Sequence, residues 1–295
     1  MNRFGFERDA RGVMRAVTLC VPTGLILITL ILVWKALPIL QSHSIVELLL
    51  GSSWDPSDSV FGFFPYIIGT IVVTVLAIFI TVPISLLSAL YLSDYSSHKA
   101  RGIIKPLIDL LAGIPSVVYG LWGTNLIVPL IRNQIAPAFS VTTTGYTVLA
   151  GGLVLSLMVF PITISIMEEV FTAIPRSMRE SSLVLGATRW ETAKFVVLKR
   201  GYPGVFAAII LGFSRAFGET IAVLMVIGNV AKVPISLFSP AYPLPALIAN
   251  NYGEMMSIPL YDSALMLAAL ILLFVVGGFS ILARIIQRRI YLRYK

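Results

Sequence analysis

The sequence has few charged residues and few of the residues that carry covalent or metal chemistry. Its single cysteine, Cys20, excludes an internal disulfide. Only 12% of the 295 residues are charged, about half the share of a typical soluble domain. The two histidines, His43 and His98, fall in separate expected loops and are not expected to share a metal ion. No P-loop, G-x-S-x-G or H-E-x-x-H sequence occurs, so we expect no ATP hydrolysis, no enzymatic activity and no cofactor bound by this chain.

Long apolar runs dominate the sequence, in which 57% of residues are hydrophobic. Runs of about 20 apolar residues are long enough to cross a bilayer. The chain is therefore predicted to be an all-α polytopic membrane protein in which residues 1–295 form one transmembrane domain. Six spans are expected, over residues 13–40, 66–92, 106–131, 147–167, 206–227 and 263–282.

Two of these runs have features of their own. The first is longer than the apolar stretch of a signal peptide, which predicts an uncleaved first span. In the third, Gly113 and Pro115 are expected to weaken the helix.

The distribution of lysine and arginine predicts the orientation. Of the 22 cations, 18 lie before the first span, after the second, after the fourth or in the C-terminal tail. Arg132 and Lys232 lie in the alternate loops, and Lys35 lies near the end of the first span. Because cytoplasmic segments are rich in cations, both termini and residues 168–205 are expected in the cytoplasm of a multi-pass inner-membrane protein. The net charge of +8 then needs no nucleic acid to explain it.

Residues 180–199 form the longest polar, helix-prone segment of the chain. At helical period Leu183, Val184, Ala187 and Trp190 fall near one face. Gly186 would allow a sharp turn between two short helices, and Trp190 is expected to pack beneath them. Such a pair of helices could hold a soluble partner at the membrane surface, whereas the alternative is a solvated connecting loop.

The spacing in this segment resembles a cytoplasmic motif of bacterial ABC importer permeases. That motif reads Glu-Ala-Ala, three residues, Gly, nine residues, Ile-x-Leu-Pro. Here Glu180 and Gly186 keep the spacing, whereas serines replace both alanines and Lys199 replaces the final proline. In such permeases the segment docks on the ATPase subunit. The resemblance implies that the coupling residues are Glu180, Ser181, Ser182, Gly186, Ala187, Thr188 and Trp190.

Two charges lie inside the expected fifth span. Arg215 and Glu219 are four residues apart and would share a face of a continuous helix, with Arg215 near mid-bilayer. Charges at this depth usually mark a transport pathway, and the alternative is a structural ion pair. A guanidinium suits a tetrahedral oxyanion because its donors form a planar fork.

Three longer stretches carry a resemblance to a known family. They are F-G-F-F-P-Y-I-I-G-T-I-V-V-T from Phe61, I-I-K-P-L-I-D-L-L-A-G-I-P-S-V-V-Y-G from Ile103, and R-A-F-G-E-T-I-A-V-L-M-V-I-G-N from Arg215. With them, the chain resembles the PstC family, the permease subunits of phosphate-specific ABC importers. The L-P-A-L-I-A-N-N-Y-G-E segment from Leu244 fits this family better than the sister PstA family.

The resemblance implies a type I ABC importer permease of MetI-like fold with six transmembrane helices. It also implies a heterodimer with PstA, two copies of the ATPase PstB that bind ATP and Mg, and the phosphate-binding protein PstS. The implied pathway residues are Ser116, Tyr119, Arg215, Glu219 and Thr220. A sulfate- or molybdate-type oxyanion permease and an ion-gradient-driven secondary transporter remain alternatives, although no half-repeat typical of the latter is evident.

Overall fold

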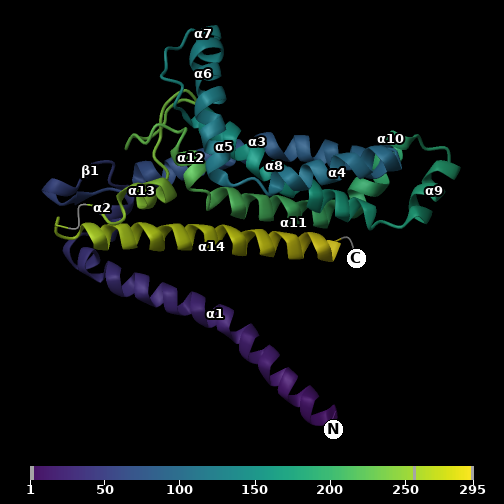
Figure 1. Ribbon diagram of the computed structural model, residues 1–295, viewed down its shortest axis with the longest axis horizontal. Helices are drawn as coiled ribbons and strands as arrows, with labels where there is room; N and C mark the ends of the chain where they lie inside the picture. Colours follow the sequence, from purple (N-terminus) through teal and green to yellow (C-terminus); the bar gives the residue numbers. More distant parts are fainter. Residues whose placement is uncertain (1–2, 255–256, 294–295) are drawn as a thin grey trace.

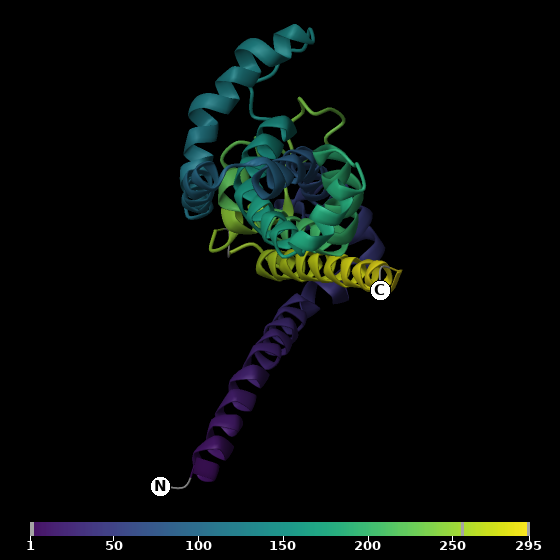
Figure 2. The ribbon, with the colours of Figure 1, turned by 90° about the vertical axis from the view of Figure 1, so that its right-hand side faces the viewer.

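The computed structural model describes residues 3–254 and 257–293, and most of them are helical (Figure 1). Helices α3, α8, α11 and α14 run side by side in a bundle, and α1 joins α14 only near its own C-terminal end (Figures 1 and 2). Among the described residues, five helices are long and apolar enough to cross a membrane. The predicted all-α polytopic architecture is therefore confirmed. The long helices are α1 (Arg3–Ser42), α3 (Phe64–Leu90), α8 (Val148–Thr172), α11 (Leu198–Phe217) and α14 (Tyr261–Arg293).

The third predicted span is broken at residues 113–115, so the weakening of the helix expected at Gly113 and Pro115 is confirmed and amounts to a full break. Helix α4 (His98–Ala112) ends before Gly113, and the helical segment Ser116–Ala138 leaves it at an angle of 93°. Pro115 causes the break because it lacks an N–H and disfavours helical geometry at the residue before it. The bent pair counts as a sixth span if it crosses the membrane as one unit. Its second arm comprises α5 (Ser116–Trp122), the π-helical turns η3 (Gly123–Ile127) and η4 (Ile131–Ile135), α6 (Val128–Leu130) and α7 (Ala136–Ala138).

The fifth span also differs from the sequence-based expectation of one helix over residues 206–227. The helix that leads into this span begins earlier, where α10 (Arg189–Glu191) runs through the π-helical turn η5 (Thr192–Val197) into α11. It also ends earlier, at Phe217, and the short helix α12 (Ile221–Leu224) follows. Gly218 directly follows Phe217 at the break. Glycine destabilises the interior of a helix, so this residue favours the end of α11 at this point.

Short elements close the end of the bundle that carries α13 (Leu244–Asn251), here called the α13 end. A hairpin of β1 (Trp54–Asp55) and β2 (Val60–Phe61) pairs Trp54 with Phe61, and η1 (Pro56–Asp58) joins its strands. The Trp54 ring makes edge contacts with Phe61, Tyr66 and Tyr261. The segment between α1 and α3, which also includes α2 (Ile45–Leu50), is thus ordered by aromatic packing on α3 and α14.

Small residues let α3 and α8 pack closely at the centre of the bundle. A Cβ on Gly151 would lie 3.0 Å from Val73 Cγ2. Ala77 and Leu155 are buried in the same cluster. Close packing of this kind holds membrane helices together, because lipid supplies no hydrophobic drive between them. The packed pair forms the scaffold beside which the breaks at 113–115 and 218–220 lie.

Candidate functional site

The two broken spans meet beside α8. Helix α5 follows the break at residues 113–115, and α12 follows the break at residues 218–220. These two helices pack against each other (Figure 1). Gly120 allows this approach, since a Cβ at this position would lie 3.2 Å from Ala222 Cα. Non-helical backbone at membrane depth is tolerated where it is buried in protein or lines a cavity. The contact between α5 and α12 is therefore a candidate for part of a transport path.

Tyr119 stabilises the bend of the third span. Its side chain is buried, and its hydroxyl donates a hydrogen bond of 2.8 Å to the carbonyl oxygen of Leu111, across the break. Arg215 lies close enough to this tyrosine to interact with it electrostatically. Tyr119 and Arg215, two of the predicted pathway residues, are thus within range of an electrostatic interaction. Ser116 is the first residue of α5, directly after Pro115, and is half-buried.

Arg215 lies in the last turn of α11, and its side chain is exposed. Glu219 lies beyond the helix end, where its Oε1 accepts a hydrogen bond of 3.5 Å from the Ala222 N–H at the start of α12. Thr220 donates to the Gly218 carbonyl oxygen at 3.3 Å. No ion pair joins Arg215 to Glu219 within the described residues. The expectation that the two share one helical face is wrong, because the helix ends at Phe217.

This arrangement suits binding of an anion. A guanidinium offers five N–H donors and no acceptor. No carboxylate pairs with Arg215 in the described part of the chain, which leaves those donors available to a passing oxyanion. No group of three His, Cys, Asp or Glu side chains able to hold a metal ion occurs over residues 11–254 and 257–288.

The docking segment, residues 176–197, has the two-helix form that the sequence predicts. Helix α9 (Arg176–Val184) ends in a turn at Gly186, whose φ is +90°. The Gly186 N–H donates to the Leu183 carbonyl oxygen at 3.0 Å, and the Ala187 N–H donates to that of Ser182 at 3.2 Å. Glycine adopts this left-handed conformation without the steric cost that a Cβ imposes. The predicted turn at Gly186 is confirmed.

A capping box starts the second short helix. The Thr188 hydroxyl accepts from the Glu191 N–H at 3.2 Å, and the Glu191 carboxylate accepts from the Thr188 N–H at 2.8 Å. The backbone N–H and then the hydroxyl of Thr188 lower the pKa of Glu191 below its ordinary value. The hydroxyls of Ser182 and Thr192 lie 3.0 Å apart and link the two short helices. Local hydrogen bonds therefore fix the geometry of the docking segment.

Apolar side chains project outward from the docking segment. Val184 and Leu185 are each 87% exposed, and Trp190 is 52% exposed. The expectation that Trp190 packs beneath the short helices is wrong, because Thr192 and Ala193 occupy the inward face. Glu180 and Ser181 are also exposed. A cluster of exposed apolar residues marks an interaction surface more often than a solvated loop.

Two ionic clusters at the α9 end of the bundle escaped the sequence reasoning. The carboxylate of Glu168, only 2% exposed, pairs with Arg101 and with Lys105, whose Nζ lies 3.2 Å away. Arg179 pairs with Asp94 at 2.7 Å. The available signal for the first cluster was an acidic residue directly after an apolar span, since charges beside lipid need partners. Helix α8 continues past this residue to Thr172.

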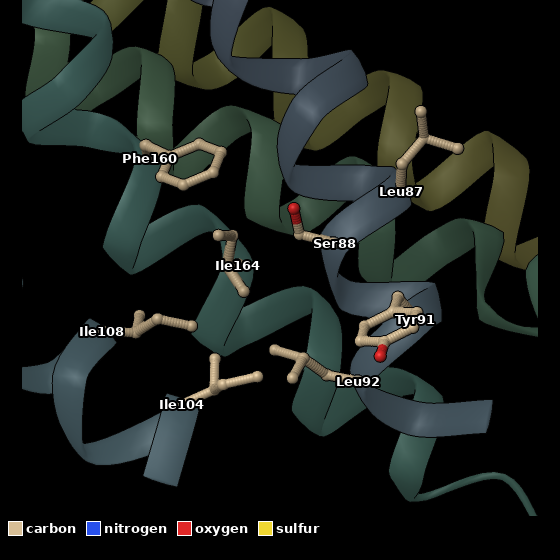
Figure 3. Close-up of a pocket in the computed structure, with 8 residues that line it drawn as sticks. All are labelled: Leu87, Ser88, Tyr91, Leu92, Ile104, Ile108, Phe160 and Ile164. Carbon is tan, nitrogen blue, oxygen red and sulfur yellow. The ribbon is translucent and has the colours of Figure 1, made fainter. Parts of the chain in front are cut away.

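An apolar cleft of about 470 Å³ opens between α3, α4 and α8 (Figure 3). Only the hydroxyls of Ser88 and Tyr91 add polarity to its wall, and no charged side chain lines it. An unpaired anion would be costly there, so this cleft is not the oxyanion site. The remaining lining residues are Leu87, Leu92, Ile104, Ile108, Phe160 and Ile164.

Comparison of sequences relates the chain to membrane components of transport systems. Residues 81–294 match the family described as "Binding-protein-dependent transport system inner membrane component". The "Probable ABC transporter permease protein YqgH" of Bacillus subtilis is 35% identical over 292 residues, which cover 98% of this chain and 93% of the relative. The "Phosphate transport system permease protein PstC" of Xylella fastidiosa strain 9a5c is 34% identical, with 96% and 93% covered. That of Pasteurella multocida is 36% identical, with 81% and 78% covered.

Comparison of structures shows the same fold. A chain of a bacterial ABC transporter involved in the import of alginate superposes with a TM-score of 0.61 at 16% identity, covering 96% of this chain and 98% of that one. A chain of the MetNI methionine ABC transporter gives a TM-score of 0.52 at 18% identity, with 75% and 91% covered. These likenesses confirm the predicted MetI-like permease fold. The chain therefore belongs to the family of inner-membrane components of binding-protein-dependent transport systems, the permease subunits of ABC transporters.

Proposed function

We propose that this chain is a permease subunit of an ATP-driven importer and that it carries inorganic phosphate across the membrane. The observation that carries the proposal is the exposed Arg215 guanidinium, placed where two broken spans meet and without a carboxylate partner among the described residues. The names of the relatives from Xylella fastidiosa and Pasteurella multocida support phosphate as the substrate. Ser116, Tyr119, Glu219 and Thr220 flank the two breaks and complete the proposed path.

Charge chemistry supports phosphate over a fully ionised oxyanion. The Arg215 fork can donate to two oxygens of any tetrahedral anion. Phosphate at neutral pH still carries a P–O–H group, which can donate a hydrogen bond to a carboxylate oxygen such as that of Glu219. Sulfate and molybdate carry no such proton at neutral pH. A passing phosphate can thus accept hydrogen bonds from Arg215 and donate one to Glu219. Sulfate has only acceptor oxygens and can donate no hydrogen bond to the Glu219 carboxylate.

The partners follow from the docking segment and the family. We propose a heterodimer with a PstA-type permease, two PstB-type ATPase subunits that bind ATP and Mg, and a PstS-type phosphate-binding protein outside. The exposed Val184, Leu185 and Trp190 suit docking of the ATPase. The proposed orientation places the α9 end and both termini in the cytoplasm, in accord with the distribution of cations.

Uptake by the reconstituted four-protein complex tests the function. Proteoliposomes with ATP inside and loaded binding protein outside should accumulate labelled phosphate. An excess of unlabelled phosphate should compete, whereas sulfate and molybdate should not. Dissipating ion gradients with ionophores should leave the uptake unchanged. Uptake of sulfate or molybdate in preference to phosphate would favour the alternative oxyanion permease, and uptake driven by an ion gradient without ATP would favour a secondary transporter.

A further inference from the structure

Arg179, on α9 of the docking segment, donates hydrogen bonds to three different residues. Its Nε donates to Asp94 Oδ1 at 2.7 Å, its Nη1 to the Ile174 carbonyl oxygen at 2.5 Å, and its Nη2 to the Phe171 carbonyl oxygen at 2.6 Å. The Phe171 carbonyl oxygen belongs to the last turn of α8, where backbone acceptors lack partners within the helix, and Ile174 lies just beyond the end of α8. All three guanidinium nitrogens are therefore engaged, and the side chain has little freedom to move independently of its partners.

Asp94 lies on η2 (Tyr91–Tyr95), the π-helical turn that extends α3. Its second carboxylate oxygen accepts from the Ser93 hydroxyl at 2.7 Å. The side chains of Asp94 and Arg179 are only 11% and 17% exposed. An ion pair so shielded from solvent is screened little, and removing one partner leaves an uncompensated charge.

The chain path makes this pair distinctive. Helix α9 is joined covalently to α8 through residues 173–175 and to α11 through α10 and η5. It has no such link to α3. Within the described part of the chain, Arg179–Asp94 is the one ion pair between the docking segment and α3 or η2.

The turn held by Asp94 is in contact with the helix that leads to the first break. Leu92 of η2 packs against Ile108 of α4 and Ile164 of α8 in one buried cluster (Figure 3). A displacement of η2 would therefore move α4 through this contact. Helix α4 ends at Ala112, directly before the bend at residues 113–115. The contacts form a continuous route from the docking segment to the proposed path.

We infer that Arg179 is a positioning residue that transmits displacement of the docking segment to α3 through Asp94. The inference rests on the proposed function, because it takes the docking segment as the site that an ATPase subunit moves. A purely structural role would confine Arg179 to capping α8. Asp94→Asn separates the two roles, since it removes the charge that Arg179 pairs with on η2 and leaves the bonds to the Phe171 and Ile174 carbonyl oxygens in place.

The first test uses the reconstituted complex with wild-type, Asp94→Asn and Arg179→Gln permeases. Both variants should still bind the ATPase and hydrolyse ATP, but phosphate moved per ATP should fall roughly twofold to thirtyfold, the range by which residues between coupled sites alter coupling. Arg179→Lys, which keeps the charge, should fall less than Arg179→Gln. Lys35→Gln removes an exposed ion pair with Asp262 at the α13 end and should keep the wild-type ratio. A wild-type ratio in Asp94→Asn would overturn the inference.

The second test does not depend on the substrate. Hydrogen exchange is measured on the permease complex with and without ATP bound to the ATPase. In the wild type, ATP should change exchange in residues 91–95 and 176–184 together, whereas in Asp94→Asn only residues 176–184 should respond. Equal responses of both segments in the variant would overturn the inference. If the wild type moved no phosphate but showed the coupled exchange, the proposed substrate would be wrong and the role of Arg179 would stand.

Discussion

Gly120 on α5 and Ala222 on α12 lie so close that a Cβ on Gly120 would be 3.2 Å from Ala222 Cα. This distance is shorter than ordinary van der Waals contact, so a side chain at residue 120 requires the two segments to move apart. Tyr119 and Thr220 adjoin the same contact. The separation of the two broken spans therefore depends on the absence of a side chain at Gly120.

Gly120→Ala should weaken transport and stability together. Overpacking of this kind typically costs about 1–3 kcal/mol, so the melting temperature of the purified complex should fall along with the rate of uptake. Gly102→Ala is the matched control, because a Cβ at Gly102 on α4 meets no atom within 4 Å. A Gly120→Ala variant as stable and active as the control would show that α5 and α12 need not approach closely.

Gly186→Val should leave the spans inserted and weaken binding of the ATPase. A side chain at φ +90° strains the backbone by about 1–2 kcal/mol, which distorts the turn between the two short helices. Gly253→Val imposes similar strain at φ +86° outside the docking segment and should retain the ATPase. Co-purification of the ATPase with each permease pair measures the effect. Full ATPase binding and full uptake with Gly186→Val would show that the docking segment is only a connecting loop.

The capping box should respond to pH. The pKa of Glu191 is lowered in the folded chain, so its contribution to stability is present at neutral pH, where the carboxylate is ionised. That contribution is lost as pH falls through the lowered pKa. Hydrogen-exchange protection of the Thr188 amide, corrected for intrinsic rates, should decrease over this range in the wild type. Glu191→Gln keeps an acceptor without a charge and should show no such transition, so parallel pH profiles for the two proteins would contradict the account.

The orientation can be read from two exposed serines, Ser57 in η1 and Ser177 in α9. In a Cys20→Ala background, a membrane-impermeant thiol reagent should label Ser57→Cys in intact cells. It should label Ser177→Cys only after permeabilisation, because the cation-rich segments are expected inside. Strong labelling of Ser177→Cys in intact cells would reverse the proposed topology.

Features set by local composition could be predicted from the sequence. The apolar runs predicted the long helices because length and hydropathy alone define a span. Gly186 predicted the turn because a left-handed residue favours glycine. The break in the third span was visible in Gly113 and Pro115, but its angle of 93° was not. That angle depends on tertiary packing, including the bond from Tyr119 to Leu111.

Features that depend on distant residues could not be predicted. Asp94 and Arg179 are 85 positions apart, and nothing local marks them as partners. Arg215 and Glu219 have helical spacing, but that spacing has meaning only while the helix continues, and it ends at Phe217. Trp190 has the size and apolarity of a core residue, but Thr192 and Ala193 take the inward face. In each case tertiary contacts, which the local sequence does not show, determined the position or the partner of the residue.

ATP-dependent phosphate uptake by Arg215 variants tests whether this guanidinium binds the transported anion. Loss of a charge-assisted hydrogen bond costs about 1.5–3 kcal/mol, so Arg215→Gln should lower uptake about tenfold to a hundredfold while the complex still assembles. Arg215→Lys should restore little, because an ammonium lacks the planar fork. Arg132→Gln removes an exposed arginine beyond the path and should transport normally. Since Arg215 and Glu219 form no ion pair, adding Glu219→Gln to Arg215→Gln should not restore uptake, and a double variant that transports at the wild-type rate would contradict the account.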